Sequence, residues 1–398
     1  MNSSELKEKI KSLSNLYLQE IISVRRHLHA SPELGFQEYK TSEYIASKLK
    51  EYDISFRKGI AKTGIVALIE GAKKGRKVIA LRTDMDALPI HESNKKEYQS
   101  GTDGVMHACG HDVHIACLLG AAKILNELRN EFEGTIKFFF QPSEETLPSG
   151  ALAMINEGVL DNPKVENVFG QHVLPALDAG KIGLKPGKYM ASSDEIYITV
   201  TGKGGHAATP ELVVNPIIIA ASVLLELSKE FEKNKPSDSP SLLAFGRISG
   251  DGRTNIIPDE VRIEGTIRSY DEKWRARAHD IISSVALSVA QNMGGNCNVN
   301  IVKGYPFLVN DEKLTGKVKR LAIDYLGNEN VVDLEMRMTA EDFAYFSQKA
   351  PSCFYRLGVR NEAKGIISNI HTSTFDVDEN CMTVGMGLMA WIAVNELK

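Results

Sequence analysis

The sequence predicts an α/β protein. A mixed, largely parallel sheet with helices on both faces forms the main domain, and a smaller α+β domain is inserted into it. First, strand-like apolar runs alternate with helical segments early in the chain and again near its end, as in doubly wound sheets. Second, the segment 188–302 follows the β-α-β-β-α-β order of a ferredoxin-like unit. Third, 398 residues with 43% hydrophobic and 25% charged residues are enough for two globular domains.

The first part of the main domain, residues 1–187, is expected to open with two helices and to continue with alternating strands and helices. Apolar residues recur at helical spacing from Ser4 to His29 and from Ser42 to Leu49. Short apolar runs that end in polar residues predict buried strands. In chain order, the remaining expected elements are strands at 63–71 and 77–89, a helix at 112–131, a strand at 134–145, a helix at 150–159 and a strand at 165–173.

The inserted domain is expected to span residues 188–302, and residues 303–398 are expected to complete the main domain. The six expected elements of the inserted domain are a strand at 194–203, a helix at 215–234, strands at 241–250 and 260–270, a helix at 274–293 and a strand at 296–304. After it, helices are expected at 314–326, 341–347 and 382–397, with a strand at 352–358.

Charge and composition argue against several classes of protein. The formal net charge of -4 leaves no basic excess to neutralise phosphates, so nucleic acid is not an expected partner. Charged residues interrupt the apolar positions at the N-terminus, and no apolar run is long enough to span a bilayer. The five cysteines are odd in number and lack a framework spacing, as is typical of a reducing compartment. We therefore expect a cytoplasmic protein with no membrane partner.

Polar side chains stand at the ends of three expected strands. Asp84 and Asp86 end the second strand, Glu144 and Glu145 end the third, and His172 ends the fourth. In open α/β sheets, ligands bind at the carboxyl ends of the strands. We therefore expect these acids and the imidazole to face one crevice.

The segment DGVMHACGHDVH, residues 103–114, contains three histidines and a cysteine at the start of an expected helix. Cys109 and His111 can face one ion, and the helix N-terminus favours the thiolate that a metal needs. Thiolate, imidazole and carboxylate together suit zinc, and manganese, cobalt or nickel would also accept such a set. Of the paired Glu144 and Glu145, one carboxylate can bind the metal while the other accepts a proton from water.

Each of these residues also has a simpler interpretation. A free cysteine is usually a small buried residue, and a pair of glutamates commonly lies on a solvated face. The ordered combination of HACGHD, QPSEE and a strand-end GQH is what favours a metal site. Four other histidines lack such company and are expected on the surface or on a helix face, without a role: His27, His29, His91 and His279.

Seven motifs resemble the two-metal amidohydrolases of the aminoacylase and carboxypeptidase metallopeptidase superfamily. They are LRTDMDALP, MHACGHDVH, QPSEE, GKGGHAATP, TNIIPDEVRIEGTIRS, AEDFAYF and IHTSTFDVDE, in family order, and the match runs from about Arg25 onward. The branch that the sequence resembles contains hippurate hydrolases, auxin-conjugate hydrolases and N-acyl-amino-acid deacylases. The resemblance implies that Cys109 bridges two metal ions, with His111 and His172 completing one site and Glu145 and His371 the other.

The same resemblance assigns the catalytic and substrate-binding residues. Glu144 becomes the general base, and His206, in the inserted domain, stabilises the oxyanion. Asn255 and Arg268 match positions that hold the carbonyl and carboxylate of the substrate. The inserted domain is then expected to be a mobile lid and the contact of a homodimer or higher oligomer, with His206 serving the metals of its own or a partner subunit.

The motifs depart from many peptidases of the wider superfamily. Those enzymes carry a His-x-Asp motif where this chain has Asp84-Met85-Asp86, and a bridging aspartate where it has Cys109. The difference favours N-acyl amino acids over peptides as substrates. It places Asp84 and Asp86 behind the ligands and leaves open whether His107 and His114 support the site or only pack against it.

The resulting hypothesis is a metal-dependent hydrolase that cleaves the amide bond of small N-acyl-amino acids, such as N-acetyl or benzoyl conjugates, and releases a carboxylic acid and a free amino acid. One alternative is a metallo-dipeptidase or carboxypeptidase acting on short peptides. A second is a thiol hydrolase with Cys109 as nucleophile, and a third is a non-catalytic binding protein. The sequence leaves the acyl group, the amino acid and the native metal open.

Overall fold

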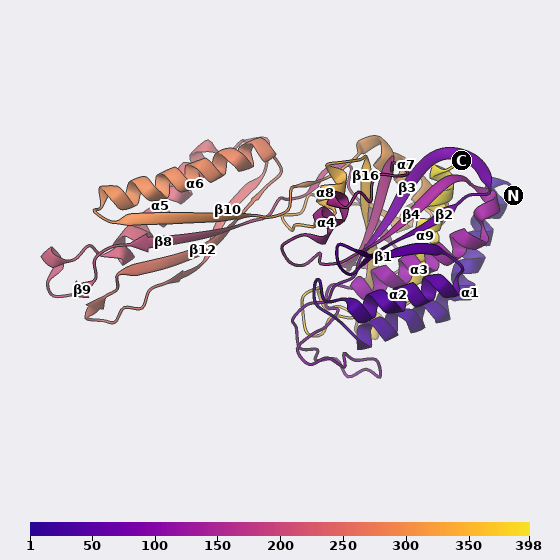
Figure 1. The fold of residues 1–398 in the computed structure, drawn as a ribbon, viewed down its shortest axis with the longest axis horizontal. Coiled ribbons are helices and arrows are strands. Elements are labelled where there is room, and N and C mark those ends of the chain that lie inside the picture. Colours follow the sequence, from indigo (N-terminus) through magenta and orange to yellow (C-terminus); the bar gives the residue numbers. More distant parts are fainter. The chain divides into compact units, whose positions relative to one another are not determined.

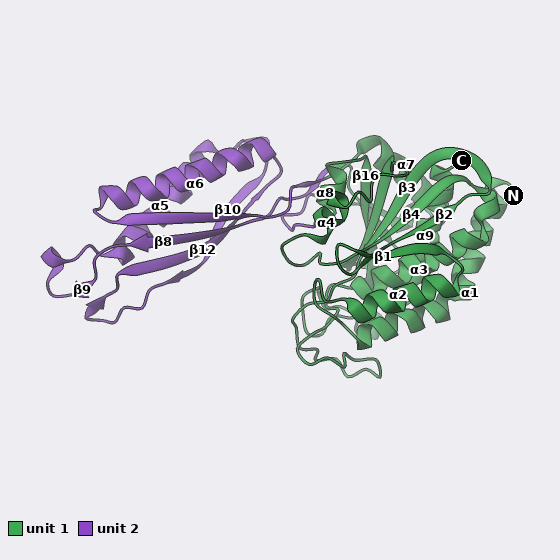
Figure 2. Cartoon of the chain, viewed as in Figure 1, with its two compact units in different colours: residues 1–187, 309–335, 342–398 green, residues 188–308, 336–341 purple.

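The computed structural model describes residues 1–398 as two compact units (Figures 1 and 2). Unit 1 comprises Met1–Gly187, Val309–Glu335 and Asp342–Lys398, and unit 2 comprises Lys188–Leu308 and Met336–Glu341. The sequence pattern placed 303–308 and 336–341 in the main domain. The segment 336–341 belongs to unit 2 because its backbone pairs with residues 189–191 there, with the Arg337 N–H 2.9 Å from the Tyr189 oxygen. None of the helices is both long and apolar enough to cross a membrane.

Unit 1 is built on an eight-stranded mixed sheet with the strand order β1-β2-β4-β3-β5-β16-β6-β15. The central strands β4, β3, β5 and β16 are parallel, while β1, β2 and β6 pair with antiparallel neighbours. This confirms the predicted mixed, largely parallel sheet. The strands are β1 (Ser55–Ile60), β2 (Gly64–Glu70), β3 (Lys73–Asp84), β4 (Glu133–Gln141), β5 (Asn167–Asp178), β6 (Ile182–Leu184), β15 (Val331–Asp333) and β16 (Ser352–Arg360).

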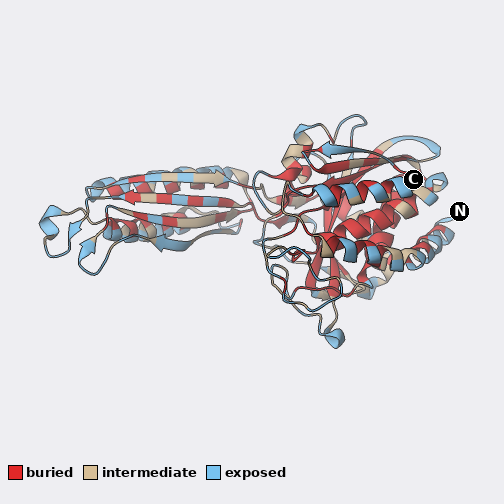
Figure 3. Cartoon of the chain, turned by 60° about the horizontal axis from the view of Figure 1, so that its bottom comes forward, coloured by how far each residue is buried: buried red, intermediate tan, exposed pale blue.

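The helices of unit 1 pack in two groups. Helices α1, α3 and α9 contact one another, and α4 and α8 contact each other and the strands β4 and β16. Buried residues are concentrated in the sheet and in α3 and α9, which are apolar almost all round (Figure 3). The expected helix at 341–347 is shortened to α8. The helices are α1 (Ser3–Ala30), α2 (Tyr39–Glu51), α3 (His111–Glu127), α4 (Gly150–Asn156), α7 (Glu312–Leu326), α8 (Ala344–Ser347) and α9 (Cys381–Glu396).

Unit 2 is a four-stranded antiparallel sheet of order β10-β12-β8-β13, and α5 and α6 pack on each other and on this sheet. Its core is separate from that of unit 1 and contains mainly aliphatic side chains. The elements are β8 (Asp194–Thr201), α5 (Pro216–Asn234), β10 (Ser241–Ser249), β12 (Glu260–Ser269), α6 (Glu272–Asn292), β13 (Asn296–Lys303) and the short pair β9 (Gly205–His206) and β11 (Ile256–Ile257). The remaining short strands are β7 (Gly187–Met190) and β14 (Leu308–Asn310).

Candidate metal centre

Three adjacent parallel strands bring polar side chains to one place in unit 1, β3 and β4 from their carboxyl ends and β5 from its middle, since β5 continues to Asp178, beyond the predicted end at 173. Strand β3 ends at Asp84, β4 leads into Glu144 and Glu145, and β5 carries His172. Helix α3 begins beside them at His111. The residue before this helix is Gly110, whose φ of 82° lies in the left-handed region that favours glycine. The strand order β4-β3-β5 therefore brings together residues that are up to 88 positions apart, from Asp84 to His172.

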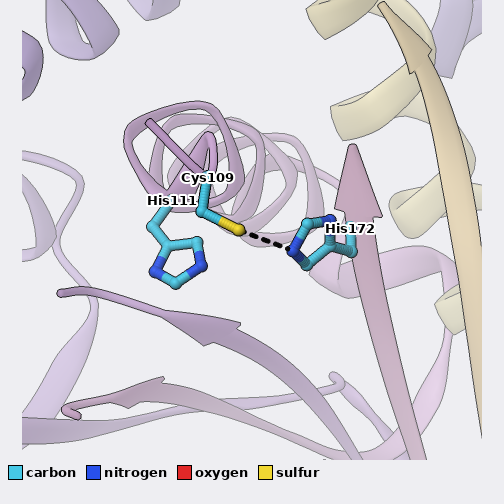
Figure 4. Close-up of side chains that lie close together, drawn as sticks. All are labelled: Cys109, His111 and His172. Atoms are coloured by element: carbon cyan, nitrogen blue, oxygen red, sulfur yellow. Dashed lines mark hydrogen bonds between the residues drawn. The ribbon is translucent and has the colours of Figure 1, made fainter. Parts of the chain in front are cut away.

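Cys109, His111 and His172 form a first group of metal-capable side chains. Their ligand atoms all lie within 4.8 Å of one another, and all three residues are buried. The Cys109 Sγ is 3.3 Å from the His172 Nε2 (Figure 4). The His172 Nδ1 donates to the Val173 carbonyl oxygen at 2.8 Å, which directs Nε2 toward the group. Burial, and then the nearby Arg356, hold the pKa of His172 well below its usual range, so this ring is in the neutral form that binds metals.

Cys109, Glu145 and His371 form a second group with the same 4.8 Å limit. The His371 Nε2 lies 3.3 Å from the Cys109 Sγ and 3.3 Å from the Glu145 Oε1. The His371 backbone N–H donates to the Ala108 oxygen at 2.8 Å, so the remote loop is attached directly to the cysteine-bearing segment. Cys109 thus belongs to both groups.

The unsatisfied atoms of the two groups fit a cation. Both ring nitrogens of His111 and the Oε1 of Glu145 are buried without a hydrogen bond, which is uncommon for such atoms. Burial, and then the carboxylates of Glu145 and Glu144, raise the pKa of the Cys109 thiol well above its ordinary value. A thiolate at this position therefore needs a positive charge beside it. Thiolate, imidazole and carboxylate are together a set that divalent metal ions accept.

Asp86 supports both groups from behind. It accepts the backbone N–H groups of Glu144 at 3.0 Å and Glu145 at 2.9 Å. It also lies 3.3 Å from the Nδ1 of His111, which leaves Nε2 directed toward Glu145 at 3.8 Å. Burial alone would lower the pKa of His111, but Asp84, Asp86 and Glu145 raise it to about 10. A carboxylate behind a histidine in this way fixes the ring and strengthens it as a ligand.

His114 cannot bind a metal in this arrangement because both of its ring nitrogens are engaged. Its Nε2 accepts the Val173 N–H at 2.9 Å, and its Nδ1 donates to Asp84 at 2.6 Å. Asp84 in turn accepts from Arg82 at 2.8 Å. Asp84 and His114 therefore support the site through hydrogen bonds, an alternative that the sequence left open. His107 is also buried, and burial lowers its pKa to about 4.

Of the four other histidines expected on the surface or on a helix face, all but His91 lie on helices, and His29 and His279 contact buried aspartates. His29 is buried, with Nδ1 2.8 Å from Asp112 and Nε2 3.2 Å from Glu92. The His279 Nε2 is 2.6 Å from Asp194. His27 and His91 are exposed. His29 and His279 each follow an arginine by four residues on the same helix, which is the one sequence signal of these contacts.

Two further carboxylates near Glu144 were missed by the sequence patterns. Glu38 is fully buried and accepts the Ser143 N–H at 2.8 Å. This bond fixes Ser143, which has a φ of 45° and directly precedes Glu144. Asp342 contacts Glu144 through its own backbone N–H at 3.3 Å. Neither lies at a strand end. Asp342 stands in the motif AEDFAYF, but the motif alone does not indicate its contact with Glu144, and no pattern indicates Glu38.

In unit 2, the structure places two of the three expected residues together. His206 in β9 pairs with Ile256 of β11, and the Ala207 N–H donates to the Asn255 oxygen at 3.1 Å. Both His206 and Asn255 are exposed. Arg268 is half-buried near the end of β12 and pairs with Leu242 of β10.

Comparisons with known proteins show the family of this chain. The family model described as "Peptidase family M20/M25/M40" matches residues 80–394. "Thermostable carboxypeptidase 2" of Saccharolobus solfataricus is 37% identical over 393 residues, 98% of this chain and 98% of the relative. "N-acetyl-L-cysteine deacetylase" of Bacillus subtilis is 37% identical over 364 residues, 92% of this chain and 85% of the relative. The crystal structure of the Bacillus subtilis YXEP protein, described as a dinuclear metal binding peptidase, has a TM-score of 0.80 and 32% identity, covering 96% of this chain and 99% of that one.

The chain therefore belongs to peptidase family M20/M25/M40, and it is a metal-dependent amidohydrolase. The family expected from the sequence motifs is confirmed.

Proposed function

We propose that this protein uses two divalent metal ions, zinc or manganese, to hydrolyse the amide bond of small N-acyl-amino acids. The observation that carries the proposal is the position of Cys109, whose sulfur lies 3.3 Å from His172 on one side and 3.3 Å from His371 on the other. From this position Cys109 would contribute to both groups of candidate ligands. His111 and His172 would hold one ion, and Glu145 and His371 the other. When bound, the ions supply Lewis acidity that polarises the amide carbonyl and acidifies water.

Glu144 is the general base in this proposal. Its neighbour Glu145 is grouped with Cys109 and His371, whereas Glu144 is not, so Glu145 is the better candidate for the ligand. Asp86 fixes the backbone of both residues, which keeps the Glu144 carboxylate at the crevice. The carboxylate takes a proton from the attacking water and passes it to the leaving amine.

The high pKa of Cys109 argues against a thiol nucleophile. Burial and two nearby carboxylates keep the sulfur protonated unless a cation neutralises them. A peptidase acting on short peptides remains the second candidate, because a 37% identical relative is named a carboxypeptidase.

Arg268 would bind the free carboxylate of the amino acid, because a guanidinium is always charged and matches a carboxylate in shape. His206 would stabilise the oxyanion together with Asn255. Substrates whose carboxylate is blocked as an amide should therefore be hydrolysed poorly.

His206 and Arg268 of one copy are too far apart to contact the same substrate. Gly204, just before His206, donates to the Asp259 carboxylate at 2.8 Å, so β9 lies by the start of β12 at Glu260. Arg268 stands eight residues further along this strand, 268 minus 260, which at 3.3 Å per residue is about 26 Å. An N-acyl-amino acid is much shorter than this separation. We therefore propose that His206 and Asn255 serve the metals of a partner subunit.

The outer surface of unit 2 offers a contact for such a partner. Strand β10 lies at the edge of its sheet with unpaired backbone groups, and exposed apolar side chains lie on β10 and on α5. They are Leu242 and Ile248 on β10, and Ile217, Ile218 and Leu225 on α5. A homodimer with this edge at its interface would cover them.

A panel of N-acetyl and N-benzoyl amino acids, their carboxamides and dipeptides tests the activity, after metal removal and add-back with zinc, manganese, cobalt or nickel. Glu144→Gln should abolish turnover while metal content stays near wild type. Glu145→Ala should lower the metal content measured by plasma emission. Wild-type turnover by Glu144→Gln would reject the proposed mechanism, and preference for dipeptides would favour the peptidase.

Mixed dimers test the origin of His206. Glu144→Gln and His206→Ala subunits are each expected to be inactive, the latter by on the order of a hundredfold or more. Activity recovered on mixing means that the histidine serves a neighbouring subunit. A mixture as inactive as its parents would mean that it serves its own.

A further inference from the structure

We propose that Asp342 is a positioning residue that fixes the orientation of the Glu144 carboxylate. The inference rests on the proposed function, in which Glu144 is the general base. The backbone N–H of Asp342 donates to the Glu144 Oε1 at 3.3 Å, although the two residues are 198 positions apart. Asp342 is fully buried and Glu144 nearly so. The position of this N–H depends on what holds the Asp342 side chain.

The Asp342 carboxylate accepts hydrogen bonds from four residues. The Arg82 Nη2 donates to Oδ1 at 2.8 Å, and the Gln141 Nε2 lies 2.9 Å from both oxygens. The Ser149 hydroxyl donates to Oδ2 at 2.7 Å, and the Ala151 N–H donates at 3.1 Å. Gln141 and Ser149 flank the turn that carries Glu144. The carboxylate therefore joins both ends of this turn to its own backbone N–H.

The same arginine connects the turn to the metal-binding groups. Arg82 also donates to Asp84 at 2.8 Å, and Asp84 accepts from His114 at 2.6 Å. His114 in turn accepts the N–H of Val173, the residue after His172. Arg82 and Asp84 are fully buried, so water does not compete for these contacts. One continuous network thus sets the position of the base relative to the candidate ligands.

Asp342→Asn is a sharp perturbation because every partner of the carboxylate is a donor. The amide is nearly the same size, but either way round its NH₂ group replaces an oxygen that accepts at least two hydrogen bonds, from Arg82 and Gln141 at Oδ1 or from Gln141, Ser149 and Ala151 at Oδ2. The turn or the Asp342 backbone must then shift. We expect kcat to fall on the order of ten- to a hundredfold, with KM within about twofold and metal content unchanged. Wild-type kcat in this variant would overturn the inference.

Glu396→Gln is the matched control. Glu396 is 2% exposed and is also surrounded by donors, with Lys77 at 2.9 Å, Lys317 at 2.7 Å and Asn167 at 3.0 Å. Lys77 and Asn167 lie toward the amino ends of β3 and β5, whereas Asp84 and His172 lie further along the same strands. Glu396→Gln should lower the denaturation midpoint while leaving kcat unchanged. If Asp342→Asn and Glu396→Gln lowered kcat equally, the effect of Asp342→Asn would be explained by general destabilisation.

Coupling to Glu144 separates positioning from a purely structural effect. In Glu144→Asp the carboxylate is one methylene shorter and moves away from the Asp342 N–H. Adding Asp342→Asn to that variant should therefore lower kcat by less than about twofold further. If Asp342→Asn lowered kcat in the Glu144→Asp variant as much as it does in the wild type, the positioning role of Asp342 would be contradicted. A crystal structure of the metal-loaded Asp342→Asn enzyme should show the Glu144 carboxylate displaced, and an unchanged carboxylate would also contradict it.

Two further measurements keep the test decisive. If Asp342→Asn does not fold, Ser149→Ala removes a single donor to the same carboxylate and should lower kcat about threefold with KM unchanged. Unchanged kcat in that variant would count against the proposal. Glu144→Gln separates the proposed function from the proposed role of Asp342. If Glu144→Gln still turns over substrate, Glu144 is not the general base and the proposed function is rejected. An inactive Glu144→Gln beside a fully active Asp342→Asn removes only the role of Asp342.

Discussion

The two units contain the same buried cluster of an arginine, an aspartate and a histidine. In unit 1, Arg25 and His29 stand four residues apart on α1, and both contact one oxygen of Asp112 at 2.8 Å. Asp112 lies in the first turn of α3, next to His111. The cluster therefore fixes the start of the helix that presents a candidate metal ligand.

In unit 2, Arg275 and His279 have the same spacing on α6. They contact one oxygen of Asp194, at 2.8 and 2.6 Å. Asp194 opens β8 and also accepts the N–H of Gly304 at 2.9 Å, just after the last strand of the sheet. This cluster therefore ties together the two ends of the chain segment that forms unit 2.

The difference between the clusters lies in what each aspartate is attached to. Both aspartates pair with a buried arginine, Asp112 through one oxygen and Asp194 through both, so removing either should destabilise the fold. Only Asp112 is adjacent to a candidate metal ligand, His111. The same kind of cluster thus supports the candidate metal centre in unit 1 and joins the first and last strands of the inserted segment in unit 2.

Asp112→Ala should have the largest effect. It removes the shortest buried contact of Arg25 and of His29, and only longer contacts remain, from Arg25 to Asp376 and Glu379 at 3.4 Å and from His29 to Glu92 at 3.2 Å. This should cost about 3 kcal/mol of unfolding free energy. It should also lower the metal content, because the start of α3 is no longer fixed. Chemical denaturation of the metal-free protein and plasma emission measure the two effects.

Asp194→Ala provides the contrast. It should cost a similar unfolding free energy, about 3 kcal/mol, because Arg275 loses its buried partner. Its metal content should remain that of the wild type. Loss of metal in this variant, or its retention in Asp112→Ala, would remove the distinction between the clusters.

The pH dependence of stability should sharpen the comparison, with a smaller effect. Burial lowers the pKa of His29, but Asp112 and Glu92 raise it more, so its folded pKa lies above the ordinary 6.5. A raised histidine pKa adds stability that is complete below the ordinary pKa and is lost as the pH rises through the folded value. The stability difference between wild type and His29→Asn should thus be larger at pH 6 than at pH 9. A constant difference, measured by denaturation across this range, would show that His29 acts only through packing.

Arg26→Ala should have the smallest effect. Arg26 contacts Glu379 at 2.6 Å, as the neighbouring Arg25 does at 3.4 Å, but its side chain is 44% exposed. Exposed ion pairs contribute at most about 1 kcal/mol. Denaturation should show Arg26→Ala within this limit, and a loss as large as that of Asp112→Ala would mean that burial does not decide the strength of these contacts.

The strand-end residues could be predicted from the sequence because their placement follows from general rules. Parallel strands joined by helices order themselves so that their carboxyl ends meet, and a short apolar run followed by acids marks such an end. Asp84 and Glu144 therefore lie at strand ends as expected, whereas His172 lies in the middle of β5, which continues to Asp178. His371 could not be found by spacing, because its loop has no periodicity and its place depends on one backbone contact to Ala108.

The sequence by itself determined the alternation of strands and helices, the inserted unit and the family, since these depend on local periodicity and short motifs. Only the tertiary structure decided how the buried charges are paired. Arg82 and Asp342 are 260 residues apart, and His29 meets Asp112 across 83. Such pairs form because a buried charge must find a partner within about 3 Å wherever the packed core places one, and that distance is not encoded in any spacing along the chain.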